Sequence, residues 1–148
     1  MQYSEEPIAV EQSFEVELDR LWEAITELDQ MRQWFFENIG AFEPKEGFET
    51  RFIVKNEDRI FPHLWKITEV DPLKKIVYNW KYEGYAGDSF VTFELSEREK
   101  GSHLKLTHQI TERFQQNIPE FHRENCLEGW NWFIKRRLKD YLEVHNRS

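Results

Sequence analysis

The amino-acid sequence predicts an α+β domain in which one long C-terminal helix lies in a curved antiparallel sheet of about six to seven strands. Two short helices are expected after the first strand. Apolar residues alternate with a period of two through the middle of the chain, which is typical of strands that bury one face. The pattern changes to helical spacing after the first alternating segment and again in the last part of the chain. Helices that are separated along the chain from an antiparallel sheet are typical of α+β domains.

The first predicted strand covers residues 8–16, where alternate residues share one side: Ile8, Val10, Gln12, Phe14 and Val16. Helical spacing follows, and charged residues lie opposite an apolar stripe made of Leu18, Leu21, Trp22, Ile25 and Leu28. A second short helical turn carries Met31, Trp34 and Phe35. These two segments predict the two short helices.

From Ile39 onward the pattern predicts a meander of strands joined by short turns. Phe42 is expected in a first short strand, and a longer strand is expected from Phe61 to Val70, where Asp71 and Pro72 end it. The other alternating segments predict strands around 48–54, 76–81, 91–95 and 104–110. Turn residues separate the strands at 44–47, 56–58, 83–88 and 99–101. Connections this short imply antiparallel neighbours.

The last segment, from Pro119 to Glu143, predicts one continuous helix of roughly 37 Å at 1.5 Å per residue. Pro119 suits a first-turn position, where its missing N–H removes no hydrogen bond. Three glutamates lie early in the segment and four basic residues lie late, an order that complements the helix dipole: Glu120, Glu124 and Glu128, then Lys135, Arg136, Arg137 and Lys139. The apolar stripe of the helix consists of Trp130, Phe133, Ile134, Leu138, Tyr141 and Leu142. A helix of this length needs a broad partner surface, which the curved sheet would supply.

The composition indicates a single domain over residues 1–148, with an ordered core from about 5 to 144. Apolar residues make up 39% of the 148 residues, and no linker-like stretch interrupts them. The net charge of −8 argues against nucleic acid or an anionic membrane as the main partner, because these need clustered Lys and Arg. Cys126 is the only cysteine, and the chain has no apolar run long enough for a membrane span and no signal-peptide pattern. A cytoplasmic location is therefore expected.

Several motifs, taken in order, resemble one known family. Leu-Trp-Glu-Ala-Ile-Thr at 21–26, followed by Trp34 and Phe35, is similar to the opening of that family. Trp-Lys-Ile-Thr-Glu-Val-Asp-Pro at 65–72 and Ile-Val-Tyr-Asn-Trp at 76–80 resemble its centre. Its later stretches resemble residues 91–95, 101–108 and 129–130. The family comprises homologues of the activator of the ninety-kilodalton heat-shock protein ATPase, C-terminal domain, within the START-like, birch-pollen-allergen-like (SRPBCC) superfamily.

This resemblance implies the helix-grip fold and a cavity between the long helix and the sheet. Members of the superfamily bind, transfer or transform very different apolar molecules, so a single activity is not implied. Aromatic residues reach 16% of the chain, and rigid aromatic walls can enclose a flat ligand. They can equally form an ordinary core, which is the favoured interpretation until a cavity is shown. By alternation and helical spacing, the candidate ligand-binding residues in this gap are Trp34, Phe52, His63, Trp65, Tyr78, Trp80, Phe93, His108, Trp130 and Phe133.

His63 and His108 are the polar members of this set. Each could hydrogen-bond a ligand or act as a base, or it could be a core histidine that is paired with the backbone or with a neighbour such as Tyr78. The core interpretation is favoured for each histidine taken singly. Gly129 in the long helix indicates either a close approach to the sheet or space for a ligand, and Cys126 is expected to be a buried thiol.

No catalytic residue, metal site or cofactor is predicted. The chain has no cysteine pair, no His-x-x-x-His spacing, no Gly-x-Ser-x-Gly motif and no glycine-rich phosphate loop. Three functions stay open: a module that binds a small apolar or aromatic molecule, a domain that docks on a chaperone or another protein, and a cyclase- or hydrolase-like enzyme with a histidine base. A binding role is favoured over an enzymatic one. Oligomeric state is left open.

Overall fold

The structure is a computed structural model that describes residues 6–114 and 117–145. Six strands form one antiparallel sheet: β1 (Ile8–Phe14), β2 (Glu49–Asn56), β3 (Arg59–Asp71), β4 (Lys75–Tyr82), β5 (Asp88–Arg98) and β6 (Gly101–Glu112). The strand order is β1-β6-β5-β4-β3-β2, so the chain forms a meander whose last strand returns to pair with the first. The helical elements are α1 (Leu18–Thr26), α2 (Leu28–Trp34), η1 (Pro119–Phe121), α3 (Arg123–Asn131), η2 (Trp132–Leu138) and α4 (Lys139–His145).

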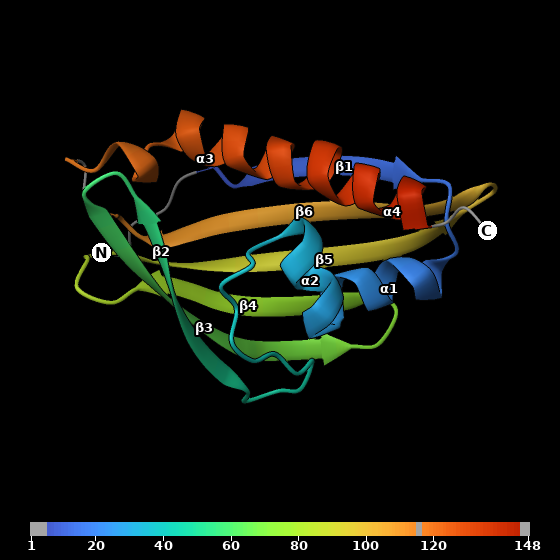
Figure 1. Ribbon diagram of the computed structural model, residues 1–148, viewed down its shortest axis with the longest axis horizontal. Coiled ribbons are helices and arrows are strands. Elements are labelled where there is room, and N and C mark those ends of the chain that lie inside the picture. The colour runs from blue at the N-terminus through green and yellow to red at the C-terminus, as the bar shows by residue number, and fades with distance from the viewer. Residues whose placement is uncertain (1–5, 115–116, 146–148) are drawn as a thin grey trace.

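The predicted α+β helix-grip architecture is confirmed. The long C-terminal helix, formed by α3, η2 and α4, runs along β1 and β6, while α1 and α2 cover the neighbouring part of the same side of the sheet (Figure 1). Alternate residues of β4, β5 and β6 are buried on this side, which is the pattern that the period of two predicted. No helix in the described part of the chain is long and apolar enough to cross a membrane.

The predicted continuous helix from Pro119 to Glu143 is wrong at its start. Pro119–Phe121 is a single 3₁₀ turn, His122 is extended, and the long helix begins only at Arg123. The packing of Phe121 explains this break in the helix. Its ring is buried against Phe61, and a continuous helix would place the ring elsewhere. From Trp132 to Leu138 the helix has π-type geometry, a form that is rare at this length.

The predicted short strand at Phe42 is also absent. The backbone around Phe42 is irregular, yet the side chain is 7% exposed and contacts the rings of Phe48, Trp65 and Tyr78. Ring contacts, and not a strand, therefore bury Phe42. An apolar residue at this position was not sufficient evidence for a strand. The expected ordered core of 5–144 starts at a residue outside the described part of the chain.

Phe35 occupies the centre of the space between the sheet and the long helix. Its ring stacks on Trp34 with centroids 4.6 Å apart, and it also contacts Trp65 at 5.5 Å and Trp130 at 5.8 Å. The backbone of Phe35 leaves helical geometry just after α2, at φ −103° and ψ −110°, and this turn directs the ring inward. Side chains around this ring fill the middle of the gap, so open space is left toward the two ends of the long helix.

Candidate functional site

A pocket of about 670 Å³ lies at the N-terminal end of the long helix, between α3 and the sheet. Its volume falls in the range of small-molecule sites. Aromatic side chains dominate its wall and come from the segment after α2, from β3 and β4, from η1 and from the long helix: Phe36, Phe61, Trp80, Tyr82, Phe121, Trp130, Trp132 and Phe133. The remaining lining residues are Val54, Lys55, Asn56, His63, His108, Glu120, Asn125, Cys126 and Gly129.

Five of the ten sequence-predicted ligand-binding residues line this pocket: His63, Trp80, His108, Trp130 and Phe133. The other five are buried in the packed core instead: Trp34, Phe52, Trp65, Tyr78 and Phe93. Phe35 separates most of this second group from the pocket by filling the middle of the gap. Phe52 supports the wall from behind, because its ring stacks on His63 at 4.9 Å.

Several residues of the pocket wall were not predicted from the sequence. Phe61 and Tyr82 continue the alternation of their strands, Phe61 with His63 and Tyr82 with Trp80, so the period of two could have identified both. Phe36 and Phe121 lie outside any strand or long helix, and no periodic signal marks them. Their positions depend on the two breaks in helical geometry, after α2 and before α3.

His108 sits in a chain of hydrogen bonds that fixes its protonation. Trp130 donates through Nε1 to His108 Nδ1 at 3.0 Å, and because indole N–H can only donate, Nδ1 must carry a lone pair. His108 Nε2 therefore carries the hydrogen and donates to Ser89 Oγ at 2.9 Å, and Ser89 donates to the carbonyl of Trp80 at 2.7 Å. Burial lowers the pKa of His108 to about 4. Both ring nitrogens are engaged, so His108 is a structural part of the wall, as its core interpretation expected.

His63 has one ring nitrogen engaged. Its Nδ1 lies 3.0 Å from the carbonyl of Phe61, and since a carbonyl only accepts, Nδ1 carries the hydrogen. Burial lowers the pKa of His63 to about 4, and the bond to Phe61 offsets only part of that effect. At neutral pH the ring is uncharged, and a base with so low a pKa accepts protons weakly. The partner of His63 is thus a backbone carbonyl and not Tyr78.

Tyr78 and Trp65 carry buried polar atoms without a partner among the described residues, Tyr78 Oη and Trp65 Nε1. Burial also raises the pKa of Tyr78, so its hydroxyl stays protonated. Both rings pack in the core, 5.0 Å apart, and neither lines the pocket at the N-terminal end of the long helix.

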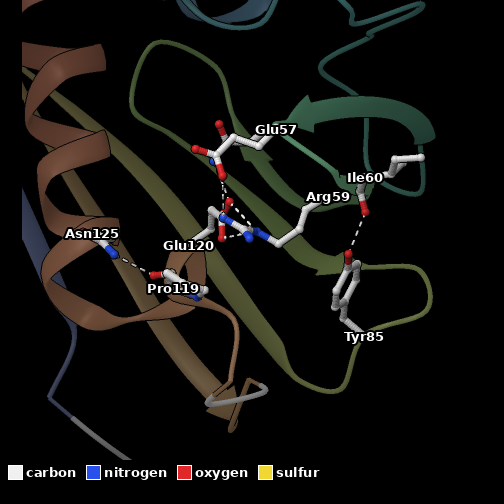
Figure 2. Close-up of polar contacts among 8 residues, drawn as sticks. Glu57, Arg59, Ile60, Tyr85, Pro119, Glu120 and Asn125 are labelled. Atoms are coloured by element: carbon white, nitrogen blue, oxygen red, sulfur yellow. Dashed lines mark hydrogen bonds and ion pairs between the residues drawn. The ribbon is translucent and has the colours of Figure 1, made fainter.

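A cluster of polar contacts ties the β2–β3 hairpin to η1 at the edge of the pocket, and we call it the latch. Glu120 accepts from Arg59 Nε at 2.8 Å, which connects the hairpin tip to the turn before the long helix (Figure 2). Glu120 also accepts from Asn56 Nδ2 at 2.5 Å. Glu57 lies 3.7 Å from Arg59, and Asn125 donates to the carbonyl of Pro119 at 2.6 Å (Figure 2). The latch therefore connects the β2–β3 hairpin to η1 across the edge of the pocket.

Gly129 opens the pocket wall on the helix side. A Cβ built on Gly129 would meet no atom within 4 Å, so the helix makes no close approach to the sheet there. The missing side chain instead adds to the pocket, which was the second of the two predicted explanations. Cys126, one turn earlier, is half-buried and not buried as expected, because it faces the same pocket.

A second pocket of about 770 Å³ lies at the other end of the long helix. Its wall is rich in charged side chains: Glu15, Arg98, Glu99, Lys100, Lys139 and Glu143. Side chains of this kind are normally solvated and gain little by enclosing an apolar molecule. Among the described residues, no three His, Cys, Asp or Glu side chains lie close enough together to hold a metal ion.

The sequence profile of activator of Hsp90 ATPase homolog 1-like proteins matches residues 15–143. The chain belongs to this family. The match confirms the family resemblance that the motifs predicted, and it spans β2 to β6 together with nearly all of the helical elements, while β1 precedes it. A search of the curated proteins found no match.

Solved structures share the fold of this family member. A protein from Chromobacterium violaceum superposes with a TM-score of 0.76 at 18% identity, over 93% of this chain and 96% of that one. A protein from Mesorhizobium loti has a TM-score of 0.73 at 21% identity, over 94% and 98%. DynU16, from the dynemicin biosynthetic locus, has a TM-score of 0.74 at 22% identity, over 95% of this chain and 48% of that one. At these identities the likeness shows the fold alone.

In this member of the family, the pocket can offer large apolar contacts and few polar ones. Trp80, Trp130 and Phe133 present ring surfaces, while His108 is already fully bonded. Such a wall stabilises an apolar or aromatic molecule by removing its surface from water.

Proposed function

We propose that this chain binds a hydrophobic or aromatic small molecule in the pocket between α3 and the sheet. The observation that carries the proposal is the 670 Å³ pocket at the N-terminal end of the long helix, where eight of the seventeen lining residues are aromatic. Gly129 supports the proposal further. Glycine inside a helix costs about 1 kcal/mol relative to alanine, and here close packing does not require it, because a Cβ at this position would meet no atom within 4 Å.

The state of the two histidines supports a binding role over a catalytic one. His108 has no free ring nitrogen, and the low pKa of His63 leaves it a weak base at neutral pH. An enzyme that used either residue as a general base would need a pKa nearer its working pH. The family name favours a protein partner. Docking on a chaperone is therefore the second hypothesis, to be tested if no ligand binds.

Two variants of Gly129 test the proposal with a matched control. Gly129→Leu should fill part of the pocket without a backbone clash, so binding of the apolar dye Nile red should fall at least tenfold. Gly129→Ala should keep most of the space and the dye binding, and should raise the free energy of unfolding by about 0.5–1 kcal/mol through higher helix propensity. Fluorescence titration and urea denaturation give the two readouts.

Native mass spectrometry of the protein purified from its own host provides the direct observation. A retained molecule would appear as added mass in the wild type and should be missing from Gly129→Leu. If Nile red binds the wild type and Gly129→Leu equally, or if neither dye nor added mass is detected, the pocket is not a ligand site and the proposal is wrong.

A further inference from the structure

We infer that the pocket selects an uncharged aromatic ligand that carries a hydroxyl group, and that the hydroxyl is held by His63 and Tyr82. The inference rests on the binding function proposed above and adds the chemical class of the ligand. It comes from two neighbouring polar atoms of the pocket wall that keep hydrogen-bonding capacity after their contacts within the protein are assigned.

His63 supplies a free acceptor. Its Nδ1 hydrogen points to the Phe61 carbonyl at 3.0 Å, so the neutral ring presents a lone pair on Nε2. No hydrogen bond to Nε2 exists among the described residues, and the side chain is only 5% exposed. An acceptor on this apolar wall is satisfied only when a ligand or water supplies a donor.

Tyr82 supplies a free donor. Trp80 donates through Nε1 to Tyr82 Oη at 2.9 Å, and since indole N–H can only donate, this bond leaves the phenolic hydrogen of Tyr82 unused. No acceptor for that hydrogen exists among the described residues. Tyr82 is half-buried and lines the pocket, so its hydrogen is available to an occupant.

The two groups are neighbours. His63 and Tyr82 are paired across β3 and β4, and their rings meet edge to face with centroids 4.7 Å apart. A hydroxyl group combines one donor with acceptor lone pairs on a single atom, so it can donate to His63 Nε2 and accept from Tyr82. An ether can only accept, and a hydrocarbon can do neither.

The surroundings favour an uncharged ligand. The ring surfaces of Phe36, Trp80 and Trp130 face the pocket, and an ion placed against them would lose its hydration. His63 is neutral and offers no counter-charge to a carboxylate, and Lys55, the cation of the pocket lining, is exposed, so its attraction for an anion is screened by water. Glu120, which lines the edge of the pocket, is already paired with Arg59 and would repel an anion.

The test compares four naphthalene derivatives by isothermal titration calorimetry at pH 7. The compound 2-naphthol donates and accepts, 2-methoxynaphthalene only accepts, 2-methylnaphthalene does neither, and 2-naphthoate is an anion. We expect 2-naphthol to bind on the order of tenfold more tightly than the methyl compound, with the methoxy compound between them and 2-naphthoate the weakest.

Two variants assign this preference to residues. Tyr82→Phe and His63→Phe keep the ring volume and should each reduce the preference for 2-naphthol over 2-methylnaphthalene severalfold, after circular dichroism confirms folding. Tyr78→Phe is the matched control, because it also removes an unpartnered hydroxyl but lies outside the pocket, and it should keep the wild-type preference.

The outcomes separate the two proposals. Equal affinities for 2-naphthol and 2-methylnaphthalene in the wild type would overturn the hydroxyl inference while leaving apolar binding intact. Tightest binding of 2-naphthoate would also overturn it. If none of the four compounds binds, the hydroxyl inference is wrong, and the Nile red titration decides whether the proposed binding function fails with it.

Discussion

Trp130 belongs to the core and to the pocket wall at the same time. It is 5% exposed, contacts Trp80 at 5.4 Å and donates to His108. Trp130→Phe should destabilise the fold by about 1–3 kcal/mol, because the buried Nδ1 of His108 loses its hydrogen-bond donor. Trp130→Ala should destabilise it by about 3–5 kcal/mol, since a cavity is added. Urea denaturation measures both free energies of unfolding.

Trp132→Phe is the matched control for Trp130→Phe. It lies in the same helix but is 48% exposed, and it packs against Phe133 and under Arg137. Trp132→Phe should change the free energy of unfolding by no more than about 0.5 kcal/mol. Equal losses in Trp130→Phe and Trp132→Phe would mean that the hydrogen bond to His108 contributes nothing to stability.

At the scale of elements, the latch joins two parts of the pocket edge that are far apart in sequence. The side chains of Arg59 and Glu120 are 33% and 24% exposed, and partly exposed ion pairs add little stability. Glu120→Ala should therefore lower the free energy of unfolding by only about 1 kcal/mol, but it should speed amide hydrogen exchange in the hairpin tip and in Pro119–Phe121. Hydrogen-exchange mass spectrometry resolves these segments.

Glu83→Ala provides the comparison for the latch. It removes the ion pair between Arg51 and Glu83, which is 2.6 Å long, involves the same hairpin and is about half exposed. Exchange in the hairpin tip and in the turn before α3 should stay at the wild-type rate. If both variants speed exchange there equally, general loosening of the hairpin and not the latch is responsible.

For the whole molecule, the two buried histidines link stability to pH. Burial lowers the pKa of His63 and of His108 to about 4, while an unfolded histidine titrates near 6.5. Between these values the unfolded chain binds more protons than the folded one, so stability rises with pH and falls on acidification. Each histidine should contribute a slope of up to about 1.4 kcal/mol per pH unit between roughly pH 6 and 4.5.

Urea denaturation at several pH values measures this slope. His63→Phe removes one of the two buried histidines, so it should remove about half of the slope that the histidines contribute. Tyr78→Phe changes a core residue that does not titrate in this range, so it should leave the slope unchanged. The lowered pKa of Glu120 acts in the same direction, but it matters only below about pH 4.5, where carboxylates begin to protonate. A slope that is identical in wild type and His63→Phe would contradict the assignment.

Periodicity predicted much of the fold and part of the pocket wall. The alternation of strand residues correctly assigned His63, Trp80 and His108 to the side of the sheet that faces the long helix, because successive side chains in a strand point to opposite faces. The helical spacing likewise identified Trp130 as an inner residue. These assignments need only local geometry, which the order of apolar and polar residues determines.

Contacts between distant segments decided the rest. Phe35 divides packed core from open pocket through a backbone turn after α2, and Phe121 interrupts the predicted helix by packing against Phe61. The hydrogen bond from Trp130 to His108 joins a helix to a strand. None of these has a periodic signal, because each depends on how complete elements pack against one another. The sequence alone therefore determined the architecture and the faces of its elements, while the position and chemistry of the pocket arose from tertiary packing.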